Sequence, residues 1–343
     1  MSNAQWRPNV AVVGHGYWGK NIARVFSQSP DFNLHTICDA RDEVRQRVAG
    51  LYPSTQQIAD LEDLDDDVEV VAIVTPTDSH YELAKACLEN GKHVLLTKPF
   101  TRYLWQTEEL LALADERNLT VFADYTFVFN PAVRKLKEML PRIGTPYFVL
   151  SQRLNLGLYQ PDVNVVYDLM PHDLSILSYL FDRSLLSAQT TLISAAGLPQ
   201  EDLAHTSFTL EGNLQGHITV SWLSPYKVRQ FYVVGSEGML SYDDTEVTEK
   251  IKFLDRGISV AELSDVQSQK AYTSRISYRS GDLYSPAIPN TEALAFELQE
   301  FRSALTDPAT RKRYNQLNLD IMTSLQHVVD GAASTEAAFT EKV

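Results

Sequence analysis

Cysteine is scarce in this 343-residue chain, which holds only Cys38 and Cys87 and no Cys-x-x-Cys pair. This scarcity excludes a disulfide scaffold and a zinc ribbon, and it fits the reducing cytoplasm. No run of eighteen apolar residues occurs, so the sequence predicts no membrane-spanning helix. The beginning of the chain also lacks the basic and then apolar segment of a secretory signal peptide. We therefore expect a cytoplasmic protein that does not act on a membrane.

Basic residues are outnumbered, since 30 Lys and Arg against 44 Asp and Glu give a formal net charge of −14. Nucleic-acid binders usually carry a basic face, and no strong cluster of Lys and Arg occurs, so we expect no nucleic-acid partner. Seven carboxylates lie in the run Asp60–Glu69. A metal site is conceivable there, but a solvated helix end and loop before a buried strand is the simpler interpretation. We predict no metal.

The length suits two domains of roughly 100–200 residues each. In the first 125 residues, short β-branched apolar runs alternate with segments of helical periodicity. Runs that are apolar at nearly every position are typical of parallel strands buried on both faces. Repeated βαβ units with right-handed crossovers predict a Rossmann-type doubly wound parallel sheet. The strands are expected at 10–13, 34–38, 68–74, 93–96 and 120–123, and the helices at 19–28, 41–50, 79–90 and 104–117.

The pattern changes after Asn130-Pro131, where closely spaced alternating runs are separated by turn signals such as Glu211–Asn213. This pattern indicates a large, open, mostly antiparallel sheet. The fold class is therefore α/β, with a Rossmann-type domain at 8–125 and an α+β domain at 126–343 whose C-terminal helices can pack back on the first. The second domain is expected to have strands at 146–155, 188–194, 203–211, 214–223, 228–235 and 238–242, helices at 131–140, 168–181, 291–306 and 313–334, and an irregular loop or lid at 255–290.

Glycines follow the first strand in the pattern Gly14-His-Gly16-Tyr-Trp-Gly19. A lone G-x-G-x-x-G is weak evidence, but this one follows a strand, opens a helix and precedes an acidic residue, Asp39, at the end of the second strand. The glycines let the backbone approach a pyrophosphate, and the helix N-terminus supplies oriented N–H groups. Asp39 is placed to bind the adenine ribose and to repel a 2′-phosphate. We therefore predict NAD rather than NADP, although Arg41 can weaken this preference.

Four ordered motifs make the chain resemble the Gfo/Idh/MocA family of NAD(P)-dependent oxidoreductases across nearly its whole length. They are the GHGYWGKN loop, Val74–His80, Gly91–Pro99 and Asp168–Asp173. The resemblance implies hydride transfer at a CH–OH group, and it implies that Val74–His80 contains the loop on the nicotinamide side of the cofactor, although His80 can also be a plain helix N-terminal residue. The predicted cofactor-binding residues are Gly14, Gly16, Tyr17, Trp18, Gly19, Asp39, Thr75, Pro76, His80 and Lys98.

The pair Lys98-Pro99 matches the family's Glu-Lys-Pro motif, whose lysine lies near the nicotinamide and the reacting carbinol. The resemblance implies that Lys98 is catalytic and that the bond before Pro99 is cis, as it often is in the family. Thr97 stands where the family usually has glutamate. This departure leaves the lysine in place and opens the question of its orientation and pKa.

The family's Asp-x-x-x-His pair falls on Asp168 and His172, and an i, i+4 spacing on a helix puts both side chains on one face. Oxidation of an alcohol needs a base within hydrogen-bond reach of the departing proton, and His172 can serve near neutral pH. Lys98 can stabilise the alkoxide or relay the proton, and Asp168 can orient or bind the sugar hydroxyls. The predicted catalytic residues are Lys98, His172 and Asp168, and the predicted substrate-binding residues are Lys98, Tyr125, Arg153, Asn155, Asp168 and His172.

The segments Tyr125–Arg134, Arg153–Gly157 and Tyr167–Ser175 look most like family members of nucleotide-sugar pathways, similar to UDP-N-acetylglucosamine 3-dehydrogenases and 3-ketosugar reductases. We expect hydride transfer between NAD and a ring hydroxyl of a sugar or nucleotide sugar, with the 3-position favoured. Three alternatives stay open: a free sugar or inositol dehydrogenase, a redox-neutral NAD-dependent glycosidase, and a non-catalytic NAD-binding sensor.

The second-domain sheet needs a cover for its outer face, because an open sheet rarely leaves apolar residues bare. The candidates for this face are Val220, Trp222 and Tyr232. The family resemblance agrees with this argument, and together they predict a homodimer or homotetramer through the C-terminal sheet.

Overall fold

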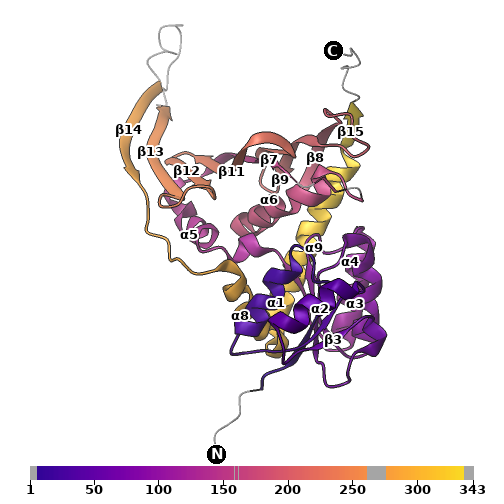
Figure 1. Ribbon diagram of the computed structural model, residues 1–343. Helices are drawn as coiled ribbons and strands as arrows, with labels where there is room; N and C mark the ends of the chain where they lie inside the picture. The colour runs from indigo at the N-terminus through magenta and orange to yellow at the C-terminus, as the bar shows by residue number, and fades with distance from the viewer. Residues whose placement is uncertain (1–5, 158, 161, 261–275, 336–343) are drawn as a thin grey trace, which may run out of the picture. The chain divides into compact units, whose positions relative to one another are not determined.

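The computed structural model describes residues 6–157, 159–160, 162–260 and 276–335. The chain forms two compact units, Met1–Phe129 with Thr291–Gln326 and Asn130–Asn290 with His327–Val343. Each unit is built on one sheet (Figure 1). The two units are described separately below.

The first unit contains a six-stranded parallel sheet of order β3-β2-β1-β4-β5-β6. Its central strands are buried at nearly every position, as the apolar runs predict. Helix α1 packs on β1 and β2, and α3 packs on β4 and β5. The strands are β1 Asn9–Val13, β2 Asn33–Cys38, β3 Gln56–Ile58, β4 Val70–Ile73, β5 His93–Thr97 and β6 Val121–Asp124, and the helices are α1 Gly19–Gln28, α2 Asp42–Leu51, α3 His80–Glu89 and α4 Leu104–Glu116.

The predicted doubly wound sheet is confirmed, and the structure adds β3, which the sequence did not predict. This strand has three residues, of which only Ile58 is buried, so it presents no apolar run. Strand β1 pairs with β2 on one side and with β4 on the other, so the order of the strands reverses between β1 and β4. In open α/β sheets ligands bind beyond the carboxyl ends of the strands at such a switch point.

The first unit is completed by a late part of the chain, α8 (Ala293–Thr306) and most of α9 (Pro308–Asp330). Phe301 of α8 is fully buried, and its ring lies 5.7 Å from that of Phe32 and 5.2 Å from that of Phe122. Thr120 donates its hydroxyl to the carbonyl oxygen of Ala304 at 3.1 Å. Aromatic packing therefore makes α8 part of the core of the first unit.

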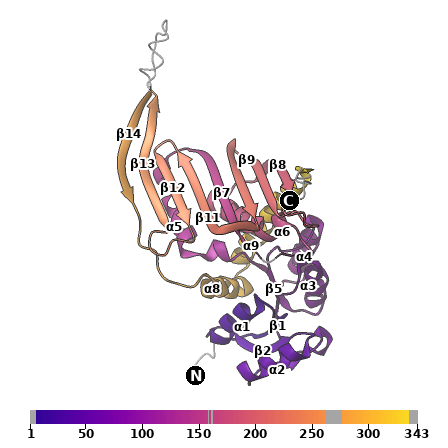
Figure 2. The same ribbon diagram turned by 45° about the horizontal axis from the view of Figure 1, so that its top comes forward.

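The second unit has a nine-stranded sheet of order β14-β13-β12-β11-β7-β10-β9-β8-β15. The pairs β7–β10 and β8–β15 are parallel and the other pairs are antiparallel. Helix α6 packs on β7, β9 and β10, while α5 packs on β12 (Figure 2). The strands are β7 Pro146–Leu156, β8 Leu185–Ile193, β9 Leu203–Leu210, β10 Leu214–Ser221, β11 Leu223–Gly235, β12 Gly238–Asp243, β13 Ile251–Val260, β14 Ile276–Tyr284 and β15 Ala332–Thr335, and the helices are α5 Pro131–Met139 and α6 Val165–Phe181.

The prediction of an irregular loop or lid over 255–290 is wrong for 255–260 and 276–284, because β13 and β14 form an antiparallel pair there, whereas residues 285–290 are irregular. Residues 261–275 of that stretch lie outside the described residues. The pair lies at the edge of the sheet, and side chains such as Tyr278 and Ile258 are 84% and 49% exposed. Strands that bury so little show no clear alternation of apolar and polar residues, and the periodicity therefore did not reveal them.

The final helix begins at Pro308 rather than near 313, and it ends at Asp330, before β15. The side-chain oxygens of Asp307 accept the backbone N–H groups of Ala309 and Thr310 at 3.2 and 3.0 Å. An aspartate cap followed by proline at the first helical position is a strong start signal. Apolar periodicity alone missed it because the first turn carries few apolar residues.

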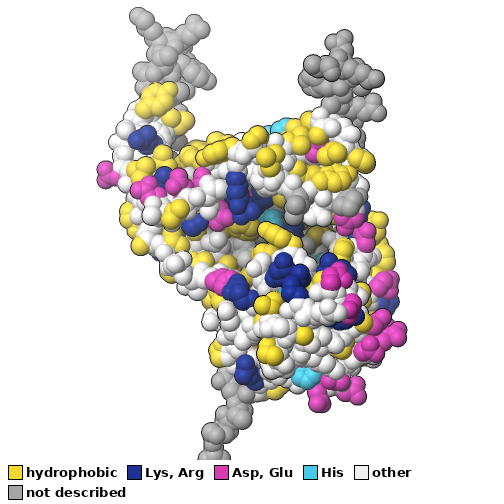
Figure 3. Space-filling view, viewed as in Figure 1, with side chains coloured by type: hydrophobic (Ala, Val, Ile, Leu, Met, Phe, Trp, Pro, Cys, Tyr) yellow, Lys and Arg dark blue, Asp and Glu magenta, His cyan; other side chains and the backbone are white. Residues whose placement is uncertain are grey.

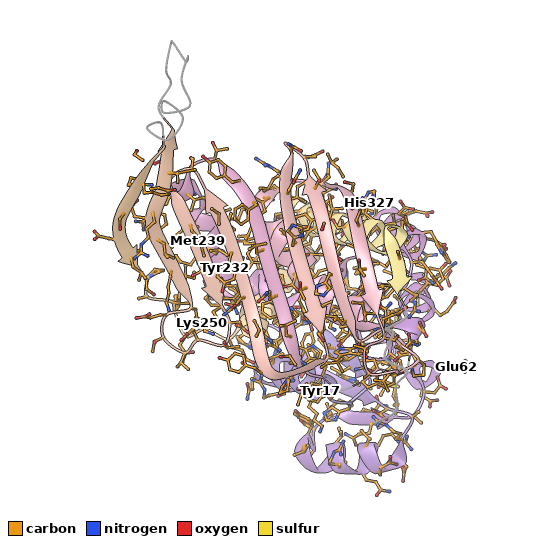
Figure 4. The ribbon with its side chains drawn as sticks, turned by 90° about the horizontal axis from the view of Figure 1, so that it is seen from above. Tyr17, Glu62, Tyr232, Met239, Lys250 and His327 are labelled. Atoms are coloured by element: carbon orange, nitrogen blue, oxygen red, sulfur yellow. The ribbon has the colours of Figure 1, made fainter. Side chains whose placement is uncertain are left out.

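The outer face of the second-unit sheet differs from the prediction at two of three residues. Val220 and Trp222 are buried, with 0% and 4% of their surface exposed, so they do not lie on that face. Tyr232 is half-buried, and Figure 4 looks onto the face of the sheet where Tyr232 of β11 and Met239 of β12 are labelled. The error is one of register, since shifting a strand by one residue moves every side chain to the other face.

Candidate active site

The glycine loop between β1 and α1 is shaped by close backbone approaches. Gly14 has a φ of +92°, and a Cβ there would lie 2.7 Å from the carbonyl oxygen of Val74. A Cβ on Gly19 would collide with the carbonyl of Gly14. A Cβ on Gly16 would meet nothing within 4 Å, so the loop is open on that side to a ligand. These features fit a backbone that binds the pyrophosphate of a dinucleotide.

The first turn of α1 leaves its N-terminal charge uncompensated, because it contains no acidic residue. The partial positive charge of the helix terminus is therefore available to an anion. Tyr17 is 79% exposed, whereas Trp18 is half-buried. The backbone carbonyl of Trp18 accepts the N–H groups of Asn21 and Ile22 at 2.8 and 3.3 Å. Trp18 is thus the residue through which the loop joins the helix.

Asp39 lies just past the end of β2 and is 6% exposed. One of its side-chain oxygens accepts the backbone N–H of His15 at 2.9 Å. The guanidinium of Arg41 donates to both oxygens, at 2.9 Å each. Burial by itself would raise the pKa of Asp39, but the bonds from Arg41 and from the backbone outweigh it and lower the pKa to about 2. Asp39 is therefore a carboxylate, the form that accepts hydrogen bonds from ribose hydroxyls.

His80, the first residue of α3, connects two loops at the carboxyl edge of the sheet. Its ring is 1% exposed, with Nε2 lying 2.9 Å from the carbonyl oxygen of Thr75. Nδ1 lies 3.1 Å from the carbonyl oxygen of Pro99 and 3.3 Å from that of Phe100. Burial lowers the pKa of His80, although the three carbonyl partners oppose this shift. A neutral ring carries one N–H, so it donates to one of the two loops at a time.

Lys98 follows β5 directly and is half-buried, and the bond between Lys98 and Pro99 is cis, as the family resemblance implies. Thr97, which replaces the family's glutamate, is 7% exposed. Its hydroxyl lies 3.4 Å from both the carbonyl oxygen of Ile73 and Nε2 of His80. Thr97 therefore brings no charge beside the lysine, and the backbone turn that carries Lys98 is held by His80.

In the second unit, Asp168 and His172 both lie on α6 and are half-buried. The indole N–H of Trp222 donates to a carboxylate oxygen of Asp168 at 2.9 Å. Asn164 caps the helix by accepting the backbone N–H of Tyr167 at 3.3 Å. The cap begins the helix about one turn before Asp168 and about two turns before His172, and Trp222 fixes the orientation of the aspartate.

Three other predicted substrate residues differ in their surroundings. Arg153 of β7 is 3% exposed, and it donates to both oxygens of Asp173 on α6, at 2.9 and 3.1 Å. Asn155, two residues further along β7, is half-buried. Tyr125 is 1% exposed, and burial raises the pKa of its phenol. Arg153 and Tyr125 are thus both buried, and Arg153 joins β7 to α6.

Sequence reasoning missed a buried acidic pair in the first unit. Asp124 ends β6 and is 2% exposed, and its Oδ2 accepts the indole N–H of Trp18 at 2.5 Å. Glu297 of α8 is 1% exposed. An aspartate at the carboxyl end of a predicted parallel strand is a signal that could have revealed Asp124. Nothing in the local sequence marks Glu297, which comes from a helix 173 positions later.

The acidic run Asp60–Glu69 is solvated as predicted, since every carboxylate in it is exposed except that of Glu69, which is half-buried. Acidic side chains are visible on the surface of the first unit in Figure 3. Within the described residues, no group of three or more His, Cys, Asp or Glu side chains is arranged to hold a metal ion. The helices of the described part also include none that is long and apolar enough to cross a membrane.

Comparison with family models identifies both halves of the chain. Residues 8–125 match the Gfo/Idh/MocA model described as an oxidoreductase family with an NAD-binding Rossmann fold. Residues 142–241 match the Gfo/Idh/MocA C-terminal domain. These matches confirm the predicted family, the oxidoreductase class and the NAD-binding domain.

Among characterised proteins, UDP-N-acetylglucosamine 3-dehydrogenase of Acidithiobacillus ferrooxidans is 25% identical over 241 residues, which cover 68% of this chain and 72% of that protein. Its solved structure superimposes with a TM-score of 0.77 at 22% identity, covering 95% of this chain and 98% of the other. Inositol 2-dehydrogenase 1 of Mycolicibacterium vanbaalenii is 27% identical over 202 residues, covering 57% of this chain and 59% of that protein.

A 3-ketoreductase from Actinomadura kijaniata, solved with NADP and TDP-benzene, superimposes with a TM-score of 0.78 at 17% identity. The match covers 97% of this chain and 100% of the other. At these identities the structural matches establish a shared fold.

The substitution His80→Phe should destabilise the protein. Phenylalanine keeps a ring of similar size but has no N–H, so the carbonyl that accepts from His80, that of Thr75 or that of Pro99, loses its donor, and an unsatisfied buried group costs about 1–3 kcal/mol. We expect a loss of this size in the free energy of unfolding, measured by urea denaturation. The control is His35→Phe, since His35 is half-buried and its ring bonds the hydroxyl of the neighbouring Thr36. Equal stability of the two variants would contradict the bridging role of His80.

The substitution Asp39→Ser should weaken NADH binding roughly 10- to 100-fold, because hydrogen bonds to a charged group contribute about 1.5–3 kcal/mol. It should weaken NADPH binding less, because the repulsion of the 2′-phosphate is removed. Both dissociation constants can be measured by fluorescence titration. Asp42→Asn, which alters an exposed carboxylate three positions away, is the matched control. Unchanged NADH affinity in Asp39→Ser would rule out the ribose-binding role.

Proposed function

The chain belongs to the Gfo/Idh/MocA family of NAD-binding oxidoreductases, and from this premise we propose that it transfers a hydride between NAD and a ring hydroxyl of a nucleotide sugar, at the 3-position. The observation that carries the proposed chemistry is Lys98, half-buried directly after β5 at the carboxyl edge of the parallel sheet. Ligands of open α/β sheets bind along this edge. An ammonium group there can act on the reacting carbinol.

When bound, NAD would accept the hydride through its nicotinamide ring. In the first unit, the loop with Gly14, Gly16 and Gly19 binds the pyrophosphate, and Asp39 binds the adenine ribose. Lys98 donates a hydrogen bond to the hydroxyl oxygen and stabilises the negative charge that develops there as the proton leaves. The turn at Lys98-Pro99 holds Lys98 in place because the His80 ring is packed between the carbonyl oxygens of Pro99 and Thr75 and donates to one of them.

In the second unit, we assign proton transfer to His172 and orientation of the sugar to Asp168. A histidine near neutral pH can accept the hydroxyl proton during oxidation and return it during reduction. Asp168, whose carboxylate is oriented by the indole N–H of Trp222, accepts hydrogen bonds from substrate hydroxyls. Arg153 acts indirectly, since its bonds to Asp173 hold α6, the helix of both residues, on β7.

The substrate class rests on the relatives. A UDP-N-acetylglucosamine 3-dehydrogenase matches 68% of the chain, which favours a nucleotide sugar. The match to an inositol 2-dehydrogenase supports a second candidate, a cyclic polyol or free sugar. NAD is preferred to NADP in this proposal because the Asp39 carboxylate repels a 2′-phosphate, while its ion pair with Arg41 limits the preference.

We also propose a homodimer or homotetramer that uses the outer face of the second-unit sheet. Phe148 and Leu150 of β7 are 40% and 37% exposed, and they pair across strands with Val234 and Tyr232 of β11. Val234 in turn pairs with Met239 of β12. These residues form a continuous apolar stripe across three strands, of the kind that a second copy covers.

The two cysteines are buried, which agrees with the cytoplasmic location that we propose.

The test of the proposed function is nicotinamide absorbance at 340 nm with purified protein, NAD and a panel of UDP-sugars, free sugars and inositols. Oxidation at the 3-position can be unfavourable, so NADH with keto sugars is tested in the reverse direction. A signal from one nucleotide sugar supports the proposal, and a signal from an inositol alone supports the second candidate. NAD binding without any redox signal would contradict both, in favour of a redox-neutral glycosidase or a sensor.

The substitutions Lys98→Met and His172→Asn should each lower kcat by roughly 100-fold or more, the usual contribution of a positioned acid–base group. NADH affinity should stay near that of the wild type, because neither side chain is assigned to the pyrophosphate or the ribose. Steady-state kinetics and fluorescence titration separate the two effects. The control Lys92→Met alters a lysine near the amino end of β5. Full turnover in either active-site variant would overturn its assigned role.

The substitution Leu150→Glu should dissociate the assembly, because it places a charge in the centre of the apolar stripe. The expected result in light scattering coupled to size-exclusion chromatography is a shift of the mass toward 38.6 kDa, that of one chain. Gln189→Glu, on an exposed position of β8 in the same sheet, is the control. An unchanged mass for Leu150→Glu would exclude this face as the interface.

A further inference from the structure

Four side chains from three distant parts of the sequence meet beneath the glycine loop of the first unit. The indole N–H of Trp18 and the hydroxyl of Thr126 donate to the two carboxylate oxygens of Asp124, at 2.5 Å each. Glu297 of α8 faces Asp124. Asp124 and Glu297 are 2% and 1% exposed, so neither carboxyl group is solvated.

In the described part of the chain, no Lys or Arg forms an ion pair with Asp124 or Glu297. Helix α8 also contacts α1 and the turn Thr126–Phe129, but Arg24 of α1 is paired with Glu292. Neither carboxyl oxygen of Glu297 meets a hydrogen-bond donor, so a charged Glu297 would be buried without any compensation.

A proton on Glu297 resolves this arrangement. Two carboxylates that share a buried site cannot both ionise without a large cost, so one of them retains a proton. Burial, followed by the negative charge of Asp124, raises the pKa of Glu297 well above its ordinary value. Asp124 already accepts two hydrogen bonds, and it is therefore the member of the pair that carries the charge. The acid O–H of Glu297 is left to donate toward it.

We propose that Asp124 and Glu297 share one proton and together hold the Trp18 indole, so that Glu297 is a positioning residue for the dinucleotide-binding loop. Trp18 lies between Gly16 and Gly19, and its carbonyl accepts the first hydrogen bonds of α1. Fixing the indole therefore fixes the backbone N–H groups that bind the pyrophosphate. Helix α8, from the far end of the chain, supplies the group that keeps Asp124 in place.

The shared proton also sets the charge near the phosphate site. With one proton the pair carries a single negative charge, whereas two charges would oppose an anionic ligand at the start of α1. The conservative variant Glu297→Gln keeps a donor toward Asp124 and cannot ionise. It should therefore bind NADH within about twofold of the wild type at pH 7. Trp18→Phe removes the indole N–H and should weaken NADH binding about tenfold.

The dependence of stability on pH gives a second, independent readout. Because the folded pKa of Glu297 is raised, the folded protein retains a proton that the unfolded chain has lost above about pH 4.5. The stability of the wild type therefore falls as pH rises from that value toward the raised pKa. Glu297→Gln lacks this contribution, so its stability relative to the wild type should increase steadily between pH 5 and 8.

The experiment measures NADH affinity by fluorescence titration at pH 7 and urea unfolding at pH 5 to 8, for the wild type, Trp18→Phe, Glu297→Gln and Glu300→Gln. The last variant is the control, because Glu300 lies on the same helix and bonds Arg313 and Tyr314 instead. Weaker NADH binding in Trp18→Phe together with the pH-dependent gain in Glu297→Gln supports the proposal. Wild-type NADH affinity in Trp18→Phe, or a Glu297→Gln stability profile parallel to that of the wild type, would overturn it. No sugar is used, so the result does not depend on the proposed substrate.

Discussion

The steric fit between Gly14 and Gly19 is the constraint on which the first unit depends. Only the absence of a side chain at Gly19 lets the start of α1 approach the Gly14 carbonyl, and this approach places the helix N-terminus directly beyond β1. The same turn brings the backbone N–H of His15 to Asp39 and the indole of Trp18 to Asp124. One close backbone contact therefore aligns the N–H groups, the acidic residue for the ribose and the buried acidic pair.

Buried polar bridges, rather than surface charges, hold the proposed catalytic elements. His80 connects the Thr75 loop to the turn of Lys98, and Arg153 connects β7 to α6, the helix of Asp168 and His172. Each bridge is almost fully enclosed, so breaking one leaves a buried group without a partner, which costs far more than the loss of an exposed ion pair. The geometry of each unit is thereby made insensitive to solvent and salt.

The replacement of the family's glutamate by Thr97 becomes intelligible in this context. The threonine hydroxyl lies within reach of His80 and the Ile73 carbonyl, so the position remains polar while its charge is lost. The turn that carries Lys98 is fixed by His80 and by backbone carbonyl groups, which are present whatever residue stands at position 97. In our proposal Lys98 acts as a donor to the substrate oxygen, and the residue before it in the chain adds no negative charge.

Local signals in the sequence determined the Rossmann domain, because buried parallel strands, glycine loops and caps each leave a pattern within a few residues. Through the family motifs the sequence also predicted Lys98, Asp168 and His172 as catalytic residues, an assignment that our proposal adopts. The edge strands β13 and β14, the register of Val220 and Trp222, and the pairing of Arg153 with Asp173 were decided by tertiary structure alone. The same holds for Glu297, which reaches Asp124 only when α8 folds back on the first unit. Burial and pairing between distant segments follow from packing, and a linear pattern carries no record of which segments meet.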